Sequence, residues 1–309
     1  MTQLILHHYP TSPFAEKVRL ILGFKGLDWS GVEIPRIMPK PDVIALTGGY
    51  RKTPVLQIGA DIYCDSALIA DVLEAHAATP SLYPKNFSAA ARTLAQWADS
   101  TLFWTAIPFA LQPPGLAHMF AGTSQEEIKA FGDDRAAFRA GVPRMRGADA
   151  DGAMRIYLSR LSDILAGDPF LFGASPTIAD FSVYHCLWFV MRAGPMGKIL
   201  EGYPTVREFV LRMRAFGHGR MQSLSSTDAI AAARSATPLP SGGLLGDTHG
   251  FKLGERVLVN ATDTGTETVE GELYALGPDR ISLAREDARA GRVVVHFPRL
   301  GFEWKRPKP

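Results

Sequence analysis

Two short polar turns carry the residues whose types and spacing best suit binding chemistry. Ser12 precedes Pro13 where an apolar run gives way to a helical pattern, and Asp65-Ser66 begin a second helical pattern. Serine and aspartate are preferred N-cap residues, and proline suits the first helical turn. A helix N-terminus also presents unpaired N–H groups and partial positive charge, so each turn can hold an anion. Helix capping alone is the simpler interpretation of both turns.

Metal and thiol chemistry find little support in the sequence. His7 and His8 are adjacent in an expected strand and therefore point to opposite faces, and no His-Glu-x-x-His spacing occurs. Two cysteines, Cys64 and Cys186, cannot build a disulfide framework or a cysteine zinc site. Cys64 lies beside the Asp65 turn, but a buried structural role is expected for both thiols. The sequence predicts no metal site.

The elements that position the two turns form an expected α/β domain over residues 1–84. An apolar run predicts a first strand, and the spacing of Val18, Ile21 and Leu22 predicts a helix with one buried face. The order is strand, helix, strand, loop, two strands and helix, which fits a small mixed sheet with helices packed on it. The later strands are expected at 32–37, 55–58 and 62–64, and the last helix from residue 66.

Residues 88–235 are expected to form an all-helical domain. An aromatic-rich helix begins near residue 94 and is kinked or stopped by Pro108, and long loops with short helices follow over 112–152. Thr177 to Asp180 form a capping box before an apolar run, which predicts a central bundle helix. The remaining helices are expected at 154–165, 205–216 and 226–234.

The hydrophobic period changes to two near the end of the chain. Residues 236–246 are rich in proline and glycine and predict a linker, and 247–309 predict short strands separated by turns. In length and strand pattern this last segment is similar to an SH3-like β-barrel. Its role and its docking site stay open. The strands are expected at 256–259, 269–276, 281–283 and 293–297.

Composition excludes several function classes. The 309 residues include 46% hydrophobic and 21% charged residues, which is ordinary for a soluble globular protein, and the net charge is +2. Neither the whole chain nor the charge-balanced last segment has the basic excess of a nucleic-acid-binding protein. Apolar runs are too short to span a bilayer, and the first residues lack a signal-peptide pattern. A soluble, cytoplasmic protein with no membrane partner is expected.

Motifs in the first two segments resemble those of the soluble glutathione S-transferase family. They are Tyr9–Arg19, Lys52–Leu56 and Asp65-Ser66 in the first segment, and Pro169–Gly173 and Pro176–Phe181 in the second. Each motif alone is weak, but their order and spacing together cover about the first 235 residues. The resemblance implies a thioredoxin-like α/β domain, an all-α bundle domain, glutathione as co-substrate and a homodimer. The barrel segment lies outside the family's usual fold.

The resemblance also implies a role for each matching residue. A free thiol has a pKa near 8.5, so little glutathione thiolate exists at neutral pH. Ser12, at a helix N-terminus, would donate a hydrogen bond to the sulfur and favour the thiolate without attacking it. Thr53-Pro54 would match the family's cis-proline and pair with the cysteinyl backbone of glutathione. Asp65 and Ser66 would bind the γ-glutamyl end.

The remaining candidates depend more heavily on the resemblance. Lys40 would pair with the glycyl carboxylate, although a solvated loop lysine is the simpler interpretation. A pocket for the electrophile is expected between the domains, where aromatic residues at helical spacing can equally be core. The candidate wall residues are Phe14, Phe103, Trp104, Phe109 and Trp188.

The residue at position 12 separates this chain from the thiol-transferring members. Those members have cysteine where this chain has Ser12, so disulfide exchange is not expected. The leading hypothesis is a detoxifying transferase that conjugates glutathione to an apolar electrophile. One alternative is a glutathione-dependent isomerase or dehalogenase. Another is a non-catalytic binding or regulatory protein that uses the barrel for interaction.

Overall fold

The first part of the chain folds as four strands with three helices. The computed structural model describes residues 3–139, 141–142, 145–246 and 249–307. β1 pairs parallel with β2 and antiparallel with β3, and β3 pairs antiparallel with β4. This is the expected thioredoxin-like arrangement, although the second strand begins at Asp28 and not at residue 32. The elements are β1 (Ile5–His8), α1 (Pro13–Phe24), β2 (Asp28–Glu33), α2 (Pro41–Thr47), β3 (Val55–Ile58), β4 (Asp61–Cys64) and α3 (Ser66–His76).

The second part is the expected helical domain. A π-helical turn precedes α5, and Pro108 lies inside α5, which continues to Ala110. The segment expected to be mostly loop contains a 14-residue helix, α7, which begins with a capping box at Ser124. The elements are α4 (Ser88–Trp97), η1 (Ala98–Leu102), α5 (Phe103–Ala110), α6 (Pro113–Met119), α7 (Gln125–Phe138), α8 (Gly147–Ile164), α9 (Ile178–Arg192), η2 (Gly194–Gly202) and α10 (Pro204–Arg214).

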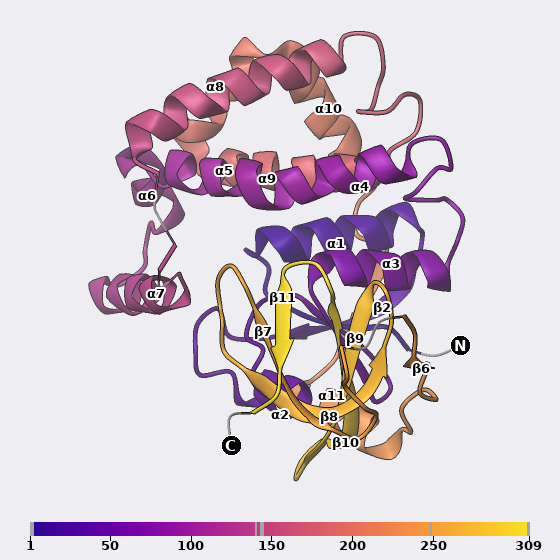
Figure 1. The fold of residues 1–309 in the computed structure, drawn as a ribbon. Helices are drawn as coiled ribbons and strands as arrows, with labels where there is room; N and C mark the ends of the chain where they lie inside the picture. The colour runs from indigo at the N-terminus through magenta and orange to yellow at the C-terminus, as the bar shows by residue number, and fades with distance from the viewer. Residues whose placement is uncertain (1–2, 140, 143–144, 247–248, 308–309) are drawn as a thin grey trace.

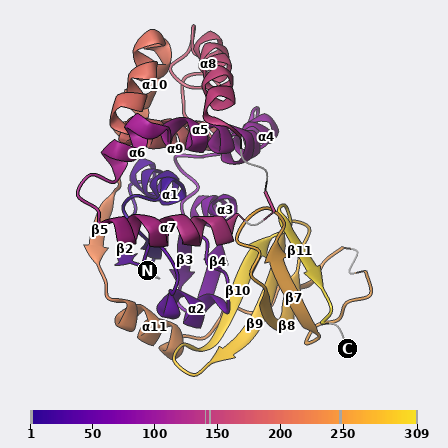
Figure 2. The same ribbon diagram turned by 90° about the vertical axis from the view of Figure 1, so that its left-hand side faces the viewer.

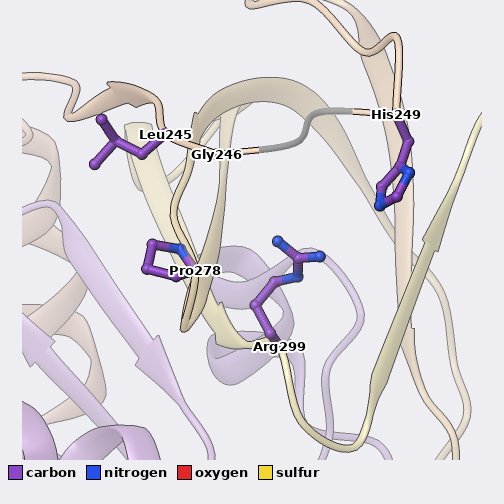
Figure 3. A pocket seen from close by; sticks show the side chains of 5 residues that line it. All are labelled: Leu245, Gly246, His249, Pro278 and Arg299. Carbon is purple, nitrogen blue, oxygen red and sulfur yellow. The ribbon is translucent and has the colours of Figure 1, made fainter.

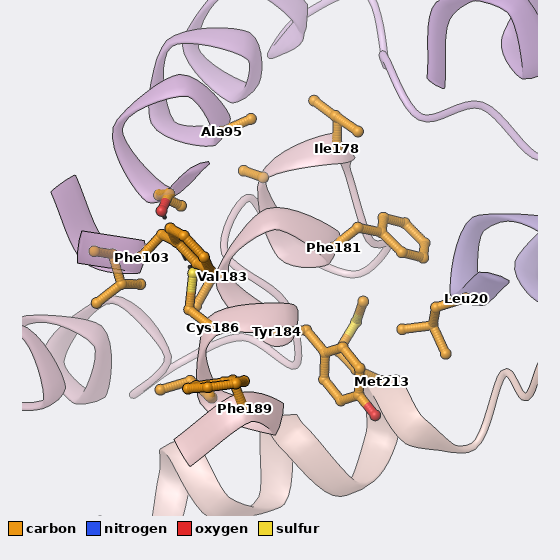
Figure 4. Packing of buried hydrophobic residues seen from close by; sticks show 14 of the residues in the cluster. Leu20, Ala95, Phe103, Ile178, Phe181, Val183, Tyr184, Cys186, Phe189 and Met213 are labelled. Carbon is orange, nitrogen blue, oxygen red and sulfur yellow. Dashed lines mark hydrogen bonds between the residues drawn. The ribbon is translucent and has the colours of Figure 1, made fainter. Parts of the chain in front are cut away.

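Helix α9 is the centre of the helical domain, as its apolar sequence predicts. The capping box of Thr177 and Asp180 is present, and Asp180 also accepts a hydrogen bond from the Leu171 N–H at 2.8 Å. Tyr184 and Phe181 are almost fully buried among side chains of α10 and α1 (Figure 4). Because α9 packs against α1, the two domains share one apolar core.

After α10 the chain returns to the sheet. β5 (Arg220–Ser223) pairs parallel with β2, and α11 (Ser226–Ser235) packs on α2 and on the strands (Figure 2). The helix expected at 226–234 is therefore present, and its partners are elements of the sheet. Gln57 makes one of these contacts directly, since its side-chain amide donates to the Ala229 carbonyl at 2.8 Å.

The last strands extend the same sheet. β10 lies parallel to β4, with Val294 opposite Asp61 and His296 opposite Tyr63. The full order is β11-β7-β8-β9-β10-β4-β3-β1-β2-β5, with β6 paired to β8, so the expected SH3-like barrel is not confirmed as a separate unit. The strands are β6 (Gly243–Leu244), β7 (Arg256–Ala261), β8 (Val269–Leu276), β9 (Arg280–Asp287), β10 (Gly291–Pro298) and β11 (Phe302–Lys305).

The two faces of the sheet bury two different cores. On one face α1 and α3 lie between the strands and the helical domain (Figure 1). On the other face a second core combines residues of the first strands, such as Val55 and Ile62, with Val295 and Phe297 of β10 and Ile230 of α11. The N-terminal strands are thus covered on one face by their own helices and on the other by parts of the chain far away in sequence.

Candidate functional site

Ser12 caps helix α1, as its sequence context predicts. Its backbone is extended (φ −77°, ψ 122°), and its Oγ accepts a hydrogen bond from the Ala15 N–H at 3.2 Å. Pro13 occupies the first helical turn, where a missing N–H costs nothing. The Ser12 N–H donates to the Tyr9 carbonyl at 3.1 Å, and the side chain is only 2% exposed. The hydroxyl hydrogen is not used by the cap, because Oγ acts there as an acceptor.

Thr53-Pro54 and Lys40 lie together beside the Ser12 turn. The Thr53-Pro54 peptide bond is cis, and the Thr53 hydroxyl accepts from Lys40 Nζ at 3.1 Å. The same ammonium donates to the Arg51 carbonyl at 3.3 Å and lies 5.6 Å from the centre of the Tyr9 ring. Burial, with nearby arginines, lowers the pKa of Lys40 to about 8. The buried Lys40 therefore joins the Arg51–Thr53 segment to Tyr9 in the turn before α1. Its pairing with a glycyl carboxylate stays a prediction.

Asp65 and Ser66 form the N-terminus of α3, as predicted. Asp65 has a positive φ of 78°, which few residues other than glycine adopt, and its carboxylate accepts from the Ala67 N–H at 2.8 Å. Ser66 is buried, and its Oγ accepts from Lys17 Nζ at 3.4 Å. Lys17 belongs to α1, so this contact joins the helix that begins beside Ser12 to the second candidate turn.

A buried charge cluster that sequence analysis missed lies beneath this contact. Lys17 is fully buried, and its Nζ lies 2.6 Å from Asp99 of η1. His185 of α9 lies with its Nε2 2.9 Å from the other oxygen of Asp99. Burial alone would raise the pKa of Asp99, but Lys17 and the hydrogen bond from His185 bring it down to about 2. No local signal joins these residues, because Lys17 and Asp99 are 82 positions apart.

Aromatic side chains from both domains meet next to this cluster. The Phe14 ring of α1 lies 4.7 Å from those of Phe103 and His185, and Phe103 lies 5.1 Å from Trp104. Phe14 and Trp104 are partly exposed, whereas Phe103 is 8% exposed. The structure therefore brings the three proposed wall residues together at the domain boundary, and their contact with a substrate stays a prediction.

The two further aromatic candidates differ from each other. Phe109 is 2% exposed and belongs to the apolar core, which gives it a packing role. Trp188 is partly buried and lies under Arg192, whose guanidinium carbon is 5.1 Å from the ring centre. Arg192 also donates to the Thr11 carbonyl at 3.2 Å, so α9 reaches the turn that contains Ser12.

Helix α7 covers the loops around Lys40 from the outside. Arg51 pairs with Asp134 of α7 and, at 3.0 Å, with Glu267 of the segment before β8. The Gly265 N–H donates to the Phe138 carbonyl at 2.8 Å, which joins the end of α7 to that same segment. Sequence analysis gave these residues no role, because the contacts join three distant parts of the chain.

Three further observations concern metal ions, membranes and the two cysteines. Within the described ranges, no group of three or more histidine, cysteine, aspartate or glutamate side chains could hold a metal ion. Among those same residues no helix is long and apolar enough to cross a membrane. Cys64 and Cys186 are both buried and unpaired, as expected.

Family models match both of the first two parts of the chain. The model described as Glutathione S-transferase, N-terminal domain, matches residues 6–81, which contain all the candidate binding residues named above in the first domain. The model described as Glutathione S-transferase, C-terminal domain, matches residues 148–212. A search of curated proteins found no significant match.

Solved structures agree with these matches. A GST-like protein from Pseudomonas syringae is 46% identical, with a TM-score of 0.84 over 99% of this chain and 100% of that chain. A glutathione S-transferase from Rhodospirillum rubrum F11 is 21% identical, with a TM-score of 0.52 over 69% of this chain and 88% of its own. The beta-etherase LigF from Sphingobium sp. strain SYK-6 is 18% identical, with a TM-score of 0.52 over 70% of this chain and 96% of its own. The last two show the fold alone, whereas the first extends through the C-terminal strands. The chain belongs to the glutathione S-transferase family.

Proposed function

We propose that this protein conjugates the thiolate of glutathione to an apolar electrophile, with Ser12 stabilising the thiolate. The observation that carries the proposal is the position of Ser12 as the N-cap of α1. A thiolate beside this residue would meet the positive end of a 12-residue helix and a hydroxyl donor. Both interactions favour the charged form of a bound thiol and therefore lower its pKa.

The size of the effect can be estimated from these two groups. A free thiol has a pKa near 8.5. The helix terminus contributes about 0.3–1 kcal/mol and a hydrogen bond to a charged group about 1.5–3 kcal/mol. Together they correspond to a pKa about two units lower, because one unit equals about 1.4 kcal/mol. Most of the bound glutathione would then be thiolate at neutral pH.

The other predicted residues would hold the rest of the tripeptide. Thr53 and Pro54 would present backbone groups to the cysteinyl residue, and Asp65 with Ser66 would bind the γ-glutamyl end at the N-terminus of α3. Two contacts support this arrangement. Lys17 of α1 binds Ser66, and Lys40 binds Thr53 while it lies over the Tyr9 ring just before α1.

The electrophile would lie on the helical-domain side of the sulfur. Phe14, Phe103 and Trp104 would supply an apolar wall there, and the Phe14 ring already contacts Phe103 and His185 of the helical domain. A homodimer is expected from the family. Detoxification is the proposed purpose, with the electrophile unidentified.

A titration of the bound thiol tests the proposal directly. The ultraviolet absorbance of the thiolate is followed against pH in the complex of protein and glutathione, for the wild type, Ser12→Ala and Ser12→Thr. We expect a pKa about two units below 8.5 in the wild type, a rise of about one unit or more in the alanine variant, and a nearly unchanged value in the threonine variant.

Conjugation rates with a general aromatic electrophile complete the test. Ser12→Ala should lose most activity at low pH, where the thiolate fraction is limiting, and little at high pH. Glutathione binding with an unshifted thiol pKa in the wild type would contradict the proposal and favour a non-catalytic binding protein.

A further inference from the structure

A second set of reactive side chains lies at the seam between β4 and β10, away from Ser12. A cavity of about 310 Å³ opens there under the segment 239–245, which crosses the seam and contains β6. We call it the seam cavity. Its wall combines aromatic, apolar and polar side chains, among them Tyr63, Tyr274, Arg280, Ser282 and His296.

Three residues of the seam form a continuous hydrogen-bonded relay. Ser282 Oγ lies 2.8 Å from His296 Nδ1, and His296 Nε2 lies 2.9 Å from Asp61 Oδ1. Ser282 comes from β9, His296 from β10 and Asp61 from β4. Strand register holds them in place, because His296 stands directly opposite Ser282 on one side and Tyr63 on the other.

The proton positions in this relay follow from the groups themselves. An ionised Asp61 can only accept hydrogen bonds, and its second oxygen accepts from the Leu239 N–H at 2.9 Å. His296 therefore donates its Nε2 hydrogen to Asp61 and presents the Nδ1 lone pair to the Ser282 hydroxyl. Burial lowers the pKa of His296, with Asp61 opposing this shift, so the ring is a neutral base at physiological pH.

Tyr63 and Arg280 complete the surroundings of the relay. The Tyr63 ring stacks on His296 with 4.5 Å between centres and 13° between planes, which holds the imidazole in one orientation. The Arg280 guanidinium lies 5.9 Å from the centre of the Tyr63 ring and lines the cavity. No described residue forms an ion pair with Arg280, so its charge is available to a bound molecule.

A second hollow lies next to the seam cavity. It shares Leu245 and Pro278 with the seam cavity and is also lined by Arg299 (Figure 3). The Arg299 side chain donates to the Gly277 carbonyl at 3.0 Å, which anchors the turn before Arg280. The relay itself is buried, with Ser282 3% and His296 7% exposed, and both side chains line the seam cavity.

We propose that the seam cavity is a second active site, in which Ser282 is a nucleophile for acyl transfer from small, uncharged carboxylic esters. The Ser282 oxygen attacks the ester carbonyl carbon while its proton passes to His296 Nδ1. Asp61 stabilises the imidazolium, and Arg280 stabilises the negative oxygen of the tetrahedral intermediate. His296 then returns the proton to the leaving alcohol, and the acyl group stays on Ser282.

Hydrolysis of the acyl-serine completes the turnover, with His296 again acting as the base. His296 takes a proton from a water molecule, the hydroxide attacks the acyl carbon, and the acid leaves as Ser282 regains its proton. No redox partner or cofactor is needed. The relay uses Nδ1 where the familiar serine-hydrolase relay uses Nε2, but the roles depend on geometry and not on which ring nitrogen serves.

Covalent labelling tests the proposal without glutathione. Full-length protein is treated with a fluorophosphonate probe, and the labelled residue is located by peptide mass spectrometry. We expect labelling of Ser282 in the wild type and in Ser223→Ala, a serine replacement at an exposed position of β5, and none at position 282 in Ser282→Ala. Hydrolysis of p-nitrophenyl acetate should fall by at least about 100-fold in Ser282→Ala and remain unchanged in Ser223→Ala.

Asp61→Asn separates a reactive relay from a merely structural one. Asparagine keeps a hydrogen-bonding group at this position but can no longer fix the same imidazole tautomer, so labelling should slow by about 100-fold or more while the protein stays folded by circular dichroism. An unlabelled Ser282 in folded wild-type protein would overturn the proposal. Labelling at an unchanged rate in Asp61→Asn would also overturn it. Neither result would affect the glutathione titration above.

Discussion

Replacing Asp99 by asparagine should destabilise the protein strongly, because the change leaves the Lys17 ammonium buried without its counterion. Lys17 is fully buried, and its Nζ lies 2.6 Å from the Asp99 carboxylate, whose side chain is 19% exposed. Removing one partner of a buried ion pair costs about 3–5 kcal/mol.

The pH dependence gives a second estimate of the same interaction. The pKa of Asp99 is about 2 in the folded protein, and an unfolded aspartate has a pKa near 3.9. The difference corresponds to about 2–3 kcal/mol, to order of magnitude. Because the folded pKa is the lower one, this stabilisation is complete above about pH 4 and is lost as the pH falls toward 2. The Asp99→Asn variant should lack this part of the acid dependence.

Urea unfolding at several pH values measures both effects. The matched control is Asp133→Asn, which breaks the exposed ion pair of Asp133 with Lys129 on α7 and should cost less than about 0.5 kcal/mol. Adding Lys17→Met to Asp99→Asn should recover much of the loss, since the unpaired charge is then gone. A cost for Asp99→Asn no larger than that of the control would refute the reasoning.

Three further predictions concern packing, thiol reactivity and the C-terminal strands. Gly23→Ala should lower the free energy of unfolding by about 1–3 kcal/mol, because the new Cβ would lie 2.0 Å from the Gly217 carbonyl oxygen; urea unfolding checks it. Cys64 and Cys186 are buried, and burial raises the pKa of both thiols, so a disulfide reagent should modify them only after denaturation. Removing residues 247–309 should expose the edge of β4 and half of one core, causing aggregation visible by size-exclusion chromatography.

Local sequence signals predicted where the helices around the site begin, but the second strand begins at Asp28 and not at residue 32. Ser12 with Pro13 marks the start of α1, and the capping box of Thr177 and Asp180 marks the start of α9. These signals work because a cap satisfies backbone groups within three residues of itself. The thioredoxin-like and helical domains followed from the order of such elements together with the family resemblance.

Long-range pairings could not be predicted in the same way. The buried pair of Lys17 and Asp99 joins two helices with no shared pattern, and a lysine on α1 looks like an exposed residue in the sequence. The alternation in residues 293–297 predicted a strand but not its partner, since period-two patterning is the same for every neighbour. The relay of Ser282, His296 and Asp61 exists only because β10 pairs with β4.

The position of β10 changes what the C-terminal strands can do for the site. β4 would be an edge strand without β10, and unpaired edges are prone to fraying and to association with other chains. β10 pairs with Asp61, Ile62 and Tyr63, and β4 ends one residue later at Cys64, directly before Asp65. The strand that delivers the α3 N-terminus is therefore held on both sides. Because Ile62 shares a core with residues of β9, β10 and α11, loosening the C-terminal strands would loosen the Asp65 turn as well.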